Sequence, residues 1–127
     1  MRRREWRRRA GKSGLSEFEA LILSAVVEAA IAYALAWATR WECRGPAHVA
    51  ASSAAATAIT HPQLWTAALW AYERYPYWPS VLTLEAAVVV VEGALITWMA
   101  MLRLDRAMLV SLAANSGSLA LGLLIER

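Results

Sequence analysis

Four strongly polar residues, Glu28, His61, Glu92 and Asn115, each stand near the middle of a long apolar segment. If these segments are helices packed side by side, the four residues come to about the same depth. Carboxyl groups removed from water bind protons more readily, and histidine titrates near neutrality. This set of residues predicts a site that handles a proton, a cation or a small cationic ligand.

Two further residues extend this candidate ligand- or proton-binding site. Glu85 precedes Glu92 by two helical turns, so the two carboxyl groups share one helix face and stand about 10 Å apart along its axis. Trp65 follows His61 by one turn and is the aromatic residue best placed to line a pocket. We therefore expect a polar seam that reaches from one end of the bundle to its middle.

Three explanations of these residues remain open at this point. The first is a transport-like path for protons or cations. The second is a metal site made by Glu28, His61 and Glu92, because histidine with carboxylates suits zinc or iron. Two observations argue against a metal site: the Glu-x-x-His pairs of di-iron bundles are absent from the sequence, and only one histidine is available as a ligand there.

The third explanation is a hydrogen-bonded cluster that only fixes the packing of the helices. A charged side chain in the middle of a membrane costs about 2.5–3.5 kcal/mol on insertion scales. A polar pair inside a membrane contributes only about 0.6 kcal/mol on average. Because stability alone is a weak reason to retain several carboxyl groups there, we favour a functional site, with proton or cation handling ahead of metal binding.

The segments that position these residues are long and apolar. Of the 127 residues 59% are hydrophobic and 18% are charged, whereas a soluble domain has about 25% charged residues. A helix needs roughly 20 residues to cross the hydrocarbon of a bilayer. The sequence predicts an all-α polytopic membrane protein in which residues 16–127 form a four-transmembrane-helix bundle, with helices at about 17–39, 48–72, 81–102 and 107–125. Little chain is left for a soluble catalytic domain, a nucleotide-binding loop or an internal repeat.

Local patterns support these helices. Ser16 and Glu19 form a capping box before the first apolar run. The second segment is rich in Ala, Ser and Thr, which predicts a central helix that is bent at Pro62. His48, at the start of this segment near the interface, is expected to be solvated. A small and polar stripe on the fourth segment predicts a packing face; it consists of Ser111, Asn115, Ser118 and Gly122.

Residues 1–15 form a strongly basic arm that contains seven of the thirteen basic residues. Beside a transmembrane helix, such an arm is expected to bind anionic lipid headgroups and to lie on the cytoplasmic side, rather than to bind nucleic acid. With the arm inside, Arg74 and Arg127 join it there and four arginines lie outside: Arg40, Arg44, Arg103 and Arg106. The sequence predicts a multi-pass protein of the cell (inner) membrane with both termini cytoplasmic.

The sequence contains a single cysteine, Cys43, so no disulfide can form within the chain and no multi-cysteine metal site is possible. No nucleophile or cofactor motif is present, so an enzyme is the less favoured class and any cofactor is unknown. We expect the lipid bilayer as a partner, together with a homo-oligomer or a larger membrane complex. A structural or accessory subunit of such a complex is the alternative function.

The short apolar helices with a central glutamate in the first of them resemble the small multidrug resistance transporters. That resemblance covers the architecture and one residue, and it implies that Glu28 would be a shared proton and substrate site in a dimer. The additional polar residues His61, Glu92 and Asn115 depart from the apolar helices of that family. The run Thr60-His61-Pro62 is also similar to small bacterial four-helix membrane proteins that carry a T-N-P or T-H-P segment, to which no activity is attached.

Overall fold

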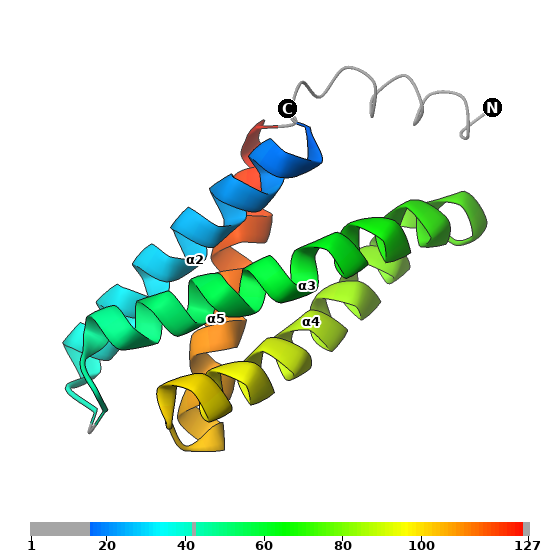
Figure 1. The fold of residues 1–127 in the computed structure, drawn as a ribbon. Helices are drawn as coiled ribbons and strands as arrows, with labels where there is room; N and C mark the ends of the chain where they lie inside the picture. The colour runs from blue at the N-terminus through cyan, green and yellow to red at the C-terminus, as the bar shows by residue number, and fades with distance from the viewer. Residues whose placement is uncertain (1–15, 42, 126–127) are drawn as a thin grey trace.

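A computed structural model describes residues 16–41 and 43–125, and within these ranges the chain forms four α-helices (Figure 1). The basic arm, residues 1–15, lies outside the described residues. The all-helical prediction is confirmed, and the helix ends agree with the predicted ones to within a few residues. The helices are α2 (Glu17–Thr39), α3 (Pro46–Arg74), α4 (Tyr77–Ala100) and α5 (Leu104–Ile125).

Helix α2 begins where the sequence indicates. The Ser16 hydroxyl accepts a hydrogen bond from the Glu19 amide at 3.2 Å, and the Glu19 carboxylate accepts one from the Ser16 amide at 2.6 Å. This reciprocal capping box satisfies amides that have no partner within the helix. Helix α3 begins with Pro46, whose missing N–H costs nothing in a first turn, and continues through Pro62.

The four helices close a ring in which α2 packs on α3, α3 on α4, α4 on α5 and α5 on α2. The first residue of α2, the last of α5 and the turn between α3 and α4 lie at one end, here named the terminal end (Figure 1). The other two connections lie at the opposite, or loop, end. The prediction that the second helix is central is wrong, because α3 has two neighbours like every other helix and leaves Ala51, Ala55 and Ala58 exposed.

The half of the ring near the loop end is filled by apolar side chains from all four helices. Most of these side chains are small, which lets the helix backbones approach closely. We name this set the apolar plug; it consists of Ala32, Ala36, Val49, Ala56, Ile96, Ala100, Leu102, Ala107 and Val110.

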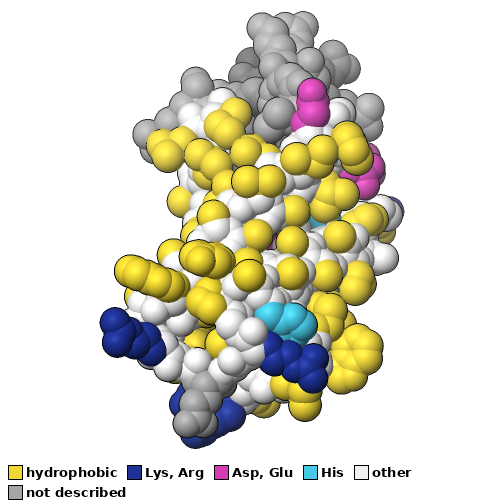
Figure 2. Space-filling view, turned by 60° about the vertical axis from the view of Figure 1, so that its left-hand side comes forward, with side chains coloured by type: hydrophobic (Ala, Val, Ile, Leu, Met, Phe, Trp, Pro, Cys, Tyr) yellow, Lys and Arg dark blue, Asp and Glu magenta, His cyan; other side chains and the backbone are white. Residues whose placement is uncertain are grey.

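Polar and apolar side chains are distributed in the opposite way to that of a soluble domain. Glu28, Glu92 and Asn115 are buried, whereas many large apolar side chains, such as Phe18 and Trp98, are exposed. Figure 2 shows apolar side chains across the middle of one face and arginine side chains gathered at the loop end. Three helices, α2, α4 and α5, are long and apolar enough to cross a membrane. This arrangement fits a protein that lipid surrounds.

The hairpins α2–α3 and α4–α5 share one pattern of burial. The buried residues of α2 recur in α4 at the same spacing, and most of those of α3 recur in α5 at a common spacing of their own. The pairs in α2 and α4 are Glu28 and Glu92, Ala32 and Ile96, and Ala36 and Ala100; those in α3 and α5 include Val49 and Ala107, Ser53 and Ser111, Ala56 and Ala114, and Thr57 and Asn115.

The repeat extends to the contacts at the loop end. His48 starts α3 and its Nε2 lies 3.0 Å from the Met99 carbonyl oxygen in α4 of the other hairpin. Arg106, its counterpart at the start of α5, places its guanidinium 5.7 Å from the ring centroid of Trp41, just after α2. His48 is thus half-buried and bonded, not solvated as expected. In each hairpin, the start of the second helix thus contacts the end of the first helix of the other hairpin.

The close approach of α4 and α5 depends on a glycine, and this leads to a stability prediction. A Cβ atom on Gly93 would overlap the Met108 side chain, whereas one on Gly122 would meet nothing. We expect Gly93→Leu to lower the free energy of unfolding by about 1–3 kcal/mol, as overpacking does in other interiors. Titration of the purified protein with SDS in mixed micelles would measure this loss. The matched variant Gly122→Leu should leave the transition unchanged, and an equal loss in both would contradict the assignment.

Candidate functional site

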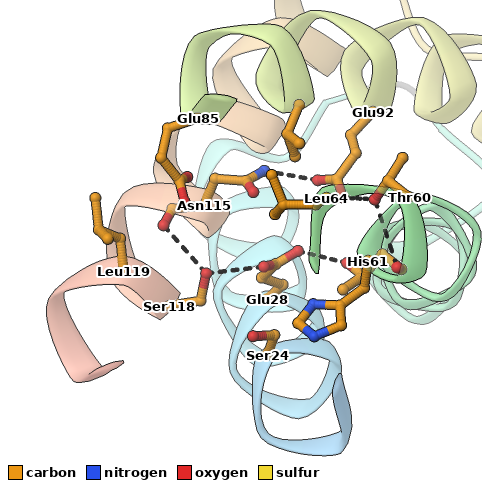
Figure 3. A pocket seen from close by; sticks show the side chains of 12 residues that line it. Ser24, Glu28, Thr60, His61, Leu64, Glu85, Glu92, Asn115, Ser118 and Leu119 are labelled. Atoms are coloured by element: carbon orange, nitrogen blue, oxygen red, sulfur yellow. Dashed lines mark hydrogen bonds between the residues drawn. The ribbon is translucent and has the colours of Figure 1, made fainter. Parts of the chain in front are cut away.

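A cavity of about 120 Å³ lies between the four helices, next to the apolar plug on its terminal side (Figure 3). Each helix contributes at least two of the side chains that line it, and most of the lining groups are polar. They are Ser24, Glu28, Thr57, Thr60, His61, Leu64, Glu85, Val88, Glu92, Asn115, Ser118 and Leu119.

The carboxylate of Glu28, on α2, is buried and is hydrogen-bonded on both oxygens. Its Oε2 accepts a hydrogen bond from the Thr57 hydroxyl of α3. Its Oε1 accepts one from the Ser118 hydroxyl of α5 at 2.8 Å. Only 2% of the Glu28 surface is exposed, so protein groups replace the water that would otherwise solvate this carboxylate.

The carboxylate of Glu92, on α4, has the same kind of surroundings. Its Oε1 accepts a hydrogen bond from the Thr60 hydroxyl of α3 at 2.5 Å, and its Oε2 accepts one from the Asn115 amide of α5 at 2.6 Å. The Asn115 amide also donates to the Ser111 carbonyl at 3.0 Å. Like Glu28, Glu92 is 2% exposed.

Each pair of neighbouring helices in the ring is thus joined by one hydrogen bond to a carboxylate. The two glutamates stand on opposite helices, α2 and α4, and both reach the same two helices, α3 and α5 (Figure 3). When one hairpin is superposed in sequence on the other, Thr57 corresponds to Asn115 and Thr60 corresponds to Ser118. Under this correspondence the partners of Glu28 become the partners of Glu92, so the site has approximate two-fold symmetry.

Three of the four donors are hydroxyl groups that face a second acceptor. The hydroxyl of Thr57 lies 3.0 Å from the Ser53 carbonyl, that of Thr60 3.1 Å from the Ala56 carbonyl, and that of Ser118 3.1 Å from the Asn115 carbonyl. A hydroxyl has one proton and can turn it toward either acceptor. The site can therefore satisfy a carboxylate, or a protonated carboxyl group that itself donates to the hydroxyl oxygen, without moving a heavy atom.

His61 introduces an unsatisfied group into this otherwise bonded site. Its side chain is 9% exposed, and its Nε2 has no hydrogen-bond partner among the described residues. His61 lines the same cavity as Glu28 and Ser24 (Figure 3). The imidazole ring stacks on Trp65, with centroids 6.1 Å apart and planes inclined by 29°. A buried polar atom without a partner marks a place where a ligand or water can bind.

Glu85 lines the cavity about two turns nearer the terminal end than Glu92 and is half-buried. The lining residues, all of them within the described ranges, include three carboxyl groups and one imidazole but no lysine or arginine. The described arginines lie instead at helix ends and in connections: Arg40, Arg44, Arg74, Arg103 and Arg106. The cavity therefore has the charge and polarity that favour a cation or a proton.

The structure brings together five of the six predicted site residues. Glu28, His61, Glu85, Glu92 and Asn115 all line the cavity, whereas Trp65 does not line it and instead supports His61. Thr60 and Ser118, which donate to the two central carboxylates, were not among the predicted site residues, and Ser118 was predicted only as part of a packing face. Their spacing is the signal that was available: Thr57 and Thr60, like Asn115 and Ser118, are three residues apart and so share a helix face.

The metal site considered for Glu28, His61 and Glu92 is not formed. Within residues 16–41 and 43–125, no three His, Cys, Asp or Glu side chains are placed so that they could hold a metal ion. The oxygens of both central carboxylates are occupied by hydroxyl and amide donors instead.

Comparison with protein-family models, with curated proteins and with solved structures finds no significant match to this chain. The assignment of a function therefore depends on the geometry of the cavity and the surface around it.

Proposed function

We propose that this protein is a membrane-embedded, transport-like proton or cation handler, with Glu28 and Glu92 as the groups that bind and release protons. The observation that carries the proposal is the pair of buried carboxylates, each linked to α3 and α5, whose hydroxyl donors face alternative acceptors. A cluster that served packing alone would need neither a pair of carboxyl groups nor an open cavity beside them.

The hydroxyl groups supply the mechanism of proton exchange. When Glu28 is ionised, Thr57 and Ser118 donate to it. When a proton binds, the new O–H donates to one of these hydroxyl oxygens, and that hydroxyl turns to its own backbone carbonyl. Glu92 exchanges protons in the same way with Thr60, which turns to Ala56. Because only hydrogens move, neither state leaves these carboxyl and hydroxyl groups without a partner.

We further propose that all four helices cross the membrane and that both termini are cytoplasmic. Helix α3 has 29 residues, a length of about 44 Å, which is ample for a bilayer. Part of its low hydropathy arises from residues that face the inside of the ring, where Ser53, Thr57 and His61 are buried. Its outward residues include Ile59 and Leu69. The basic arm sets the orientation, because positive residues stay on the cytoplasmic side.

Infrared difference spectroscopy of the full chain in lipid tests proton binding directly. A protonated carboxyl group in apolar surroundings absorbs at a higher frequency than a hydrated one. We expect two such bands to appear when the pH is lowered, one of them absent in Glu28→Gln and the other in Glu92→Gln. Glutamine preserves the size of the side chain and can donate to a hydroxyl as the protonated acid does, so both variants should fold.

The matched control for this experiment is Asp105→Asn, which removes a carboxyl group at the loop end. The Asp105 side chain is 64% exposed and pairs with Arg103 at 3.3 Å. Its removal should leave both buried bands unchanged. Spectra in which no band depends on Glu28 or Glu92 at any pH where the protein stays folded would overturn the proposal.

A further inference from the structure

Comparing the two halves of the cavity shows where its approximate symmetry fails. The paired positions Glu28 and Glu92 are alike, but Ser24 and His61 beside Glu28 correspond to Val88 and Leu119 beside Glu92. All six of these residues line the cavity. At these two paired positions the lining is polar beside Glu28 and apolar beside Glu92, although Leu64 also lines the cavity on the His61 side and Glu85 on the Val88 side.

One polar atom of the cavity lining, the Nε2 of His61, has no hydrogen-bond partner among the described residues. His61 is more than nine-tenths buried, and it lines the same cavity as Glu28 (Figure 3). A neutral imidazole has one nitrogen that accepts a hydrogen bond and one that donates. A ligand that donates an N–H to this nitrogen while it places positive charge near Glu28 would satisfy both groups.

The size of the cavity limits the ligand. A volume of about 120 Å³ is well below the roughly 300–1,000 Å³ of sites for drug-sized molecules. Inorganic alkali cations prefer oxygen ligands, and imidazole is a poor partner for them. An ammonium group has N–H donors that a nitrogen and a carboxylate can both accept, and the apolar side chains beside Glu92 can contact a short carbon chain.

We propose that the cavity binds a small primary ammonium ion, with its nitrogen between Glu28 and His61 and its alkyl group against Val88 and Leu119. This inference rests on the proposed carboxylate site and names its ligand, but it does not depend on proton exchange. The ion would enter from the terminal end, since the apolar plug fills the ring on the other side.

Nuclear magnetic resonance of the full chain in lipid nanodiscs, labelled with ¹⁵N in histidine, tests this inference with methylammonium chloride as the probe. The chain contains two histidines, so His48, bonded to the Met99 carbonyl, supplies an internal reference. We expect methylammonium to shift the His61 Nε2 signal in a saturable way while the His48 signals stay in place. Burial of one methyl group should make methylammonium bind about fourfold more tightly than ammonium.

Three comparisons make the result specific. Sodium chloride at equal ionic strength and tetramethylammonium, which has no N–H and is larger, should leave His61 unshifted. Glu28→Gln should lose the methylammonium shift, and Asp105→Asn should keep it. Unchanged His48 signals would show that Glu28→Gln remains folded.

A His61 signal that does not respond to methylammonium, or that responds equally to sodium, would overturn the inference. If the infrared bands of Glu28 and Glu92 are nevertheless present, the proton site stands and only its ligand is wrong. If those bands are absent while methylammonium binds, the cavity is a cation site without proton exchange.

Discussion

Glu28→Gln and Glu92→Gln should each reduce proton movement in reconstituted vesicles by about tenfold or more, which corresponds to about 1.4 kcal/mol or more of activation free energy. The physical reason is that glutamine can hold the hydrogen bonds of the neutral acid but cannot exchange a proton. The two carboxyl groups have equivalent partners on α3 and α5, so we expect losses of similar size. A pH-sensitive dye trapped in the vesicles, with a potassium diffusion potential as the driving force, would measure the rate.

Two controls distinguish a loss of proton exchange from a loss of folded protein in the vesicles. Asp105→Asn, exposed at the loop end, should transport like the natural sequence. The glutamine variants should elute as folded, monodisperse protein and be reconstituted in equal amounts. Undiminished transport by either glutamine variant would remove that carboxyl group from the proposed path.

Asn115→Leu should lower the free energy of unfolding by about 1–3 kcal/mol, because it leaves a buried Glu92 oxygen without a donor. In the double variant Asn115→Leu/Glu92→Leu both partners are apolar, and the Thr60 hydroxyl can turn to the Ala56 carbonyl at 3.1 Å. We therefore expect the double variant to regain most of the lost stability. SDS titration in mixed micelles, followed by circular dichroism, would give the four free energies of the double-mutant cycle.

The cycle separates a direct contact from two independent effects on packing. Neighbours that share a hydrogen bond give coupling energies of about 0.5–3 kcal/mol, whereas distant sites are additive within about 0.5 kcal/mol. Additive losses from Asn115→Leu and Glu92→Leu would show that the amide–carboxylate bond contributes nothing to stability. Gly122→Leu provides a reference for a tolerated substitution on α5, because an added Cβ at Gly122 would meet no neighbouring atom.

The helices and the depth of the site could be predicted from the sequence because both depend on local patterns. The capping box at Ser16, Pro46 at the start of α3 and the length of the apolar runs all act within one segment. The shared depth of Glu28 and Glu92 follows from their places in those runs. None of these patterns shows which faces of the helices meet, so the partners of the carboxylates required the structure.

The repeat of the hairpins was missed for a different reason. Some paired positions have the same residue, such as Glu28 and Glu92, but others share only their burial: Ala32 corresponds to Ile96 and Thr57 to Asn115. The two hairpins also differ in the length of their connections, as α2 ends at Thr39 and α3 begins at Pro46, whereas α4 ends at Ala100 and α5 begins at Leu104. A comparison at one fixed spacing therefore fails to align both helices of a hairpin at once.

In a bundle that spans a membrane as proposed, the apolar plug also determines where an electrical potential acts. In a membrane, voltage falls mainly across the layer that contains neither water nor mobile charge. With the cavity on one side of the plug, the bulk of that drop lies between the central carboxylates and the loop end. Moving one elementary charge through the full drop is worth about 2.3 kcal/mol per 100 mV. Binding from the terminal end would therefore respond weakly to voltage, and passage beyond Glu28 and Glu92 would respond strongly.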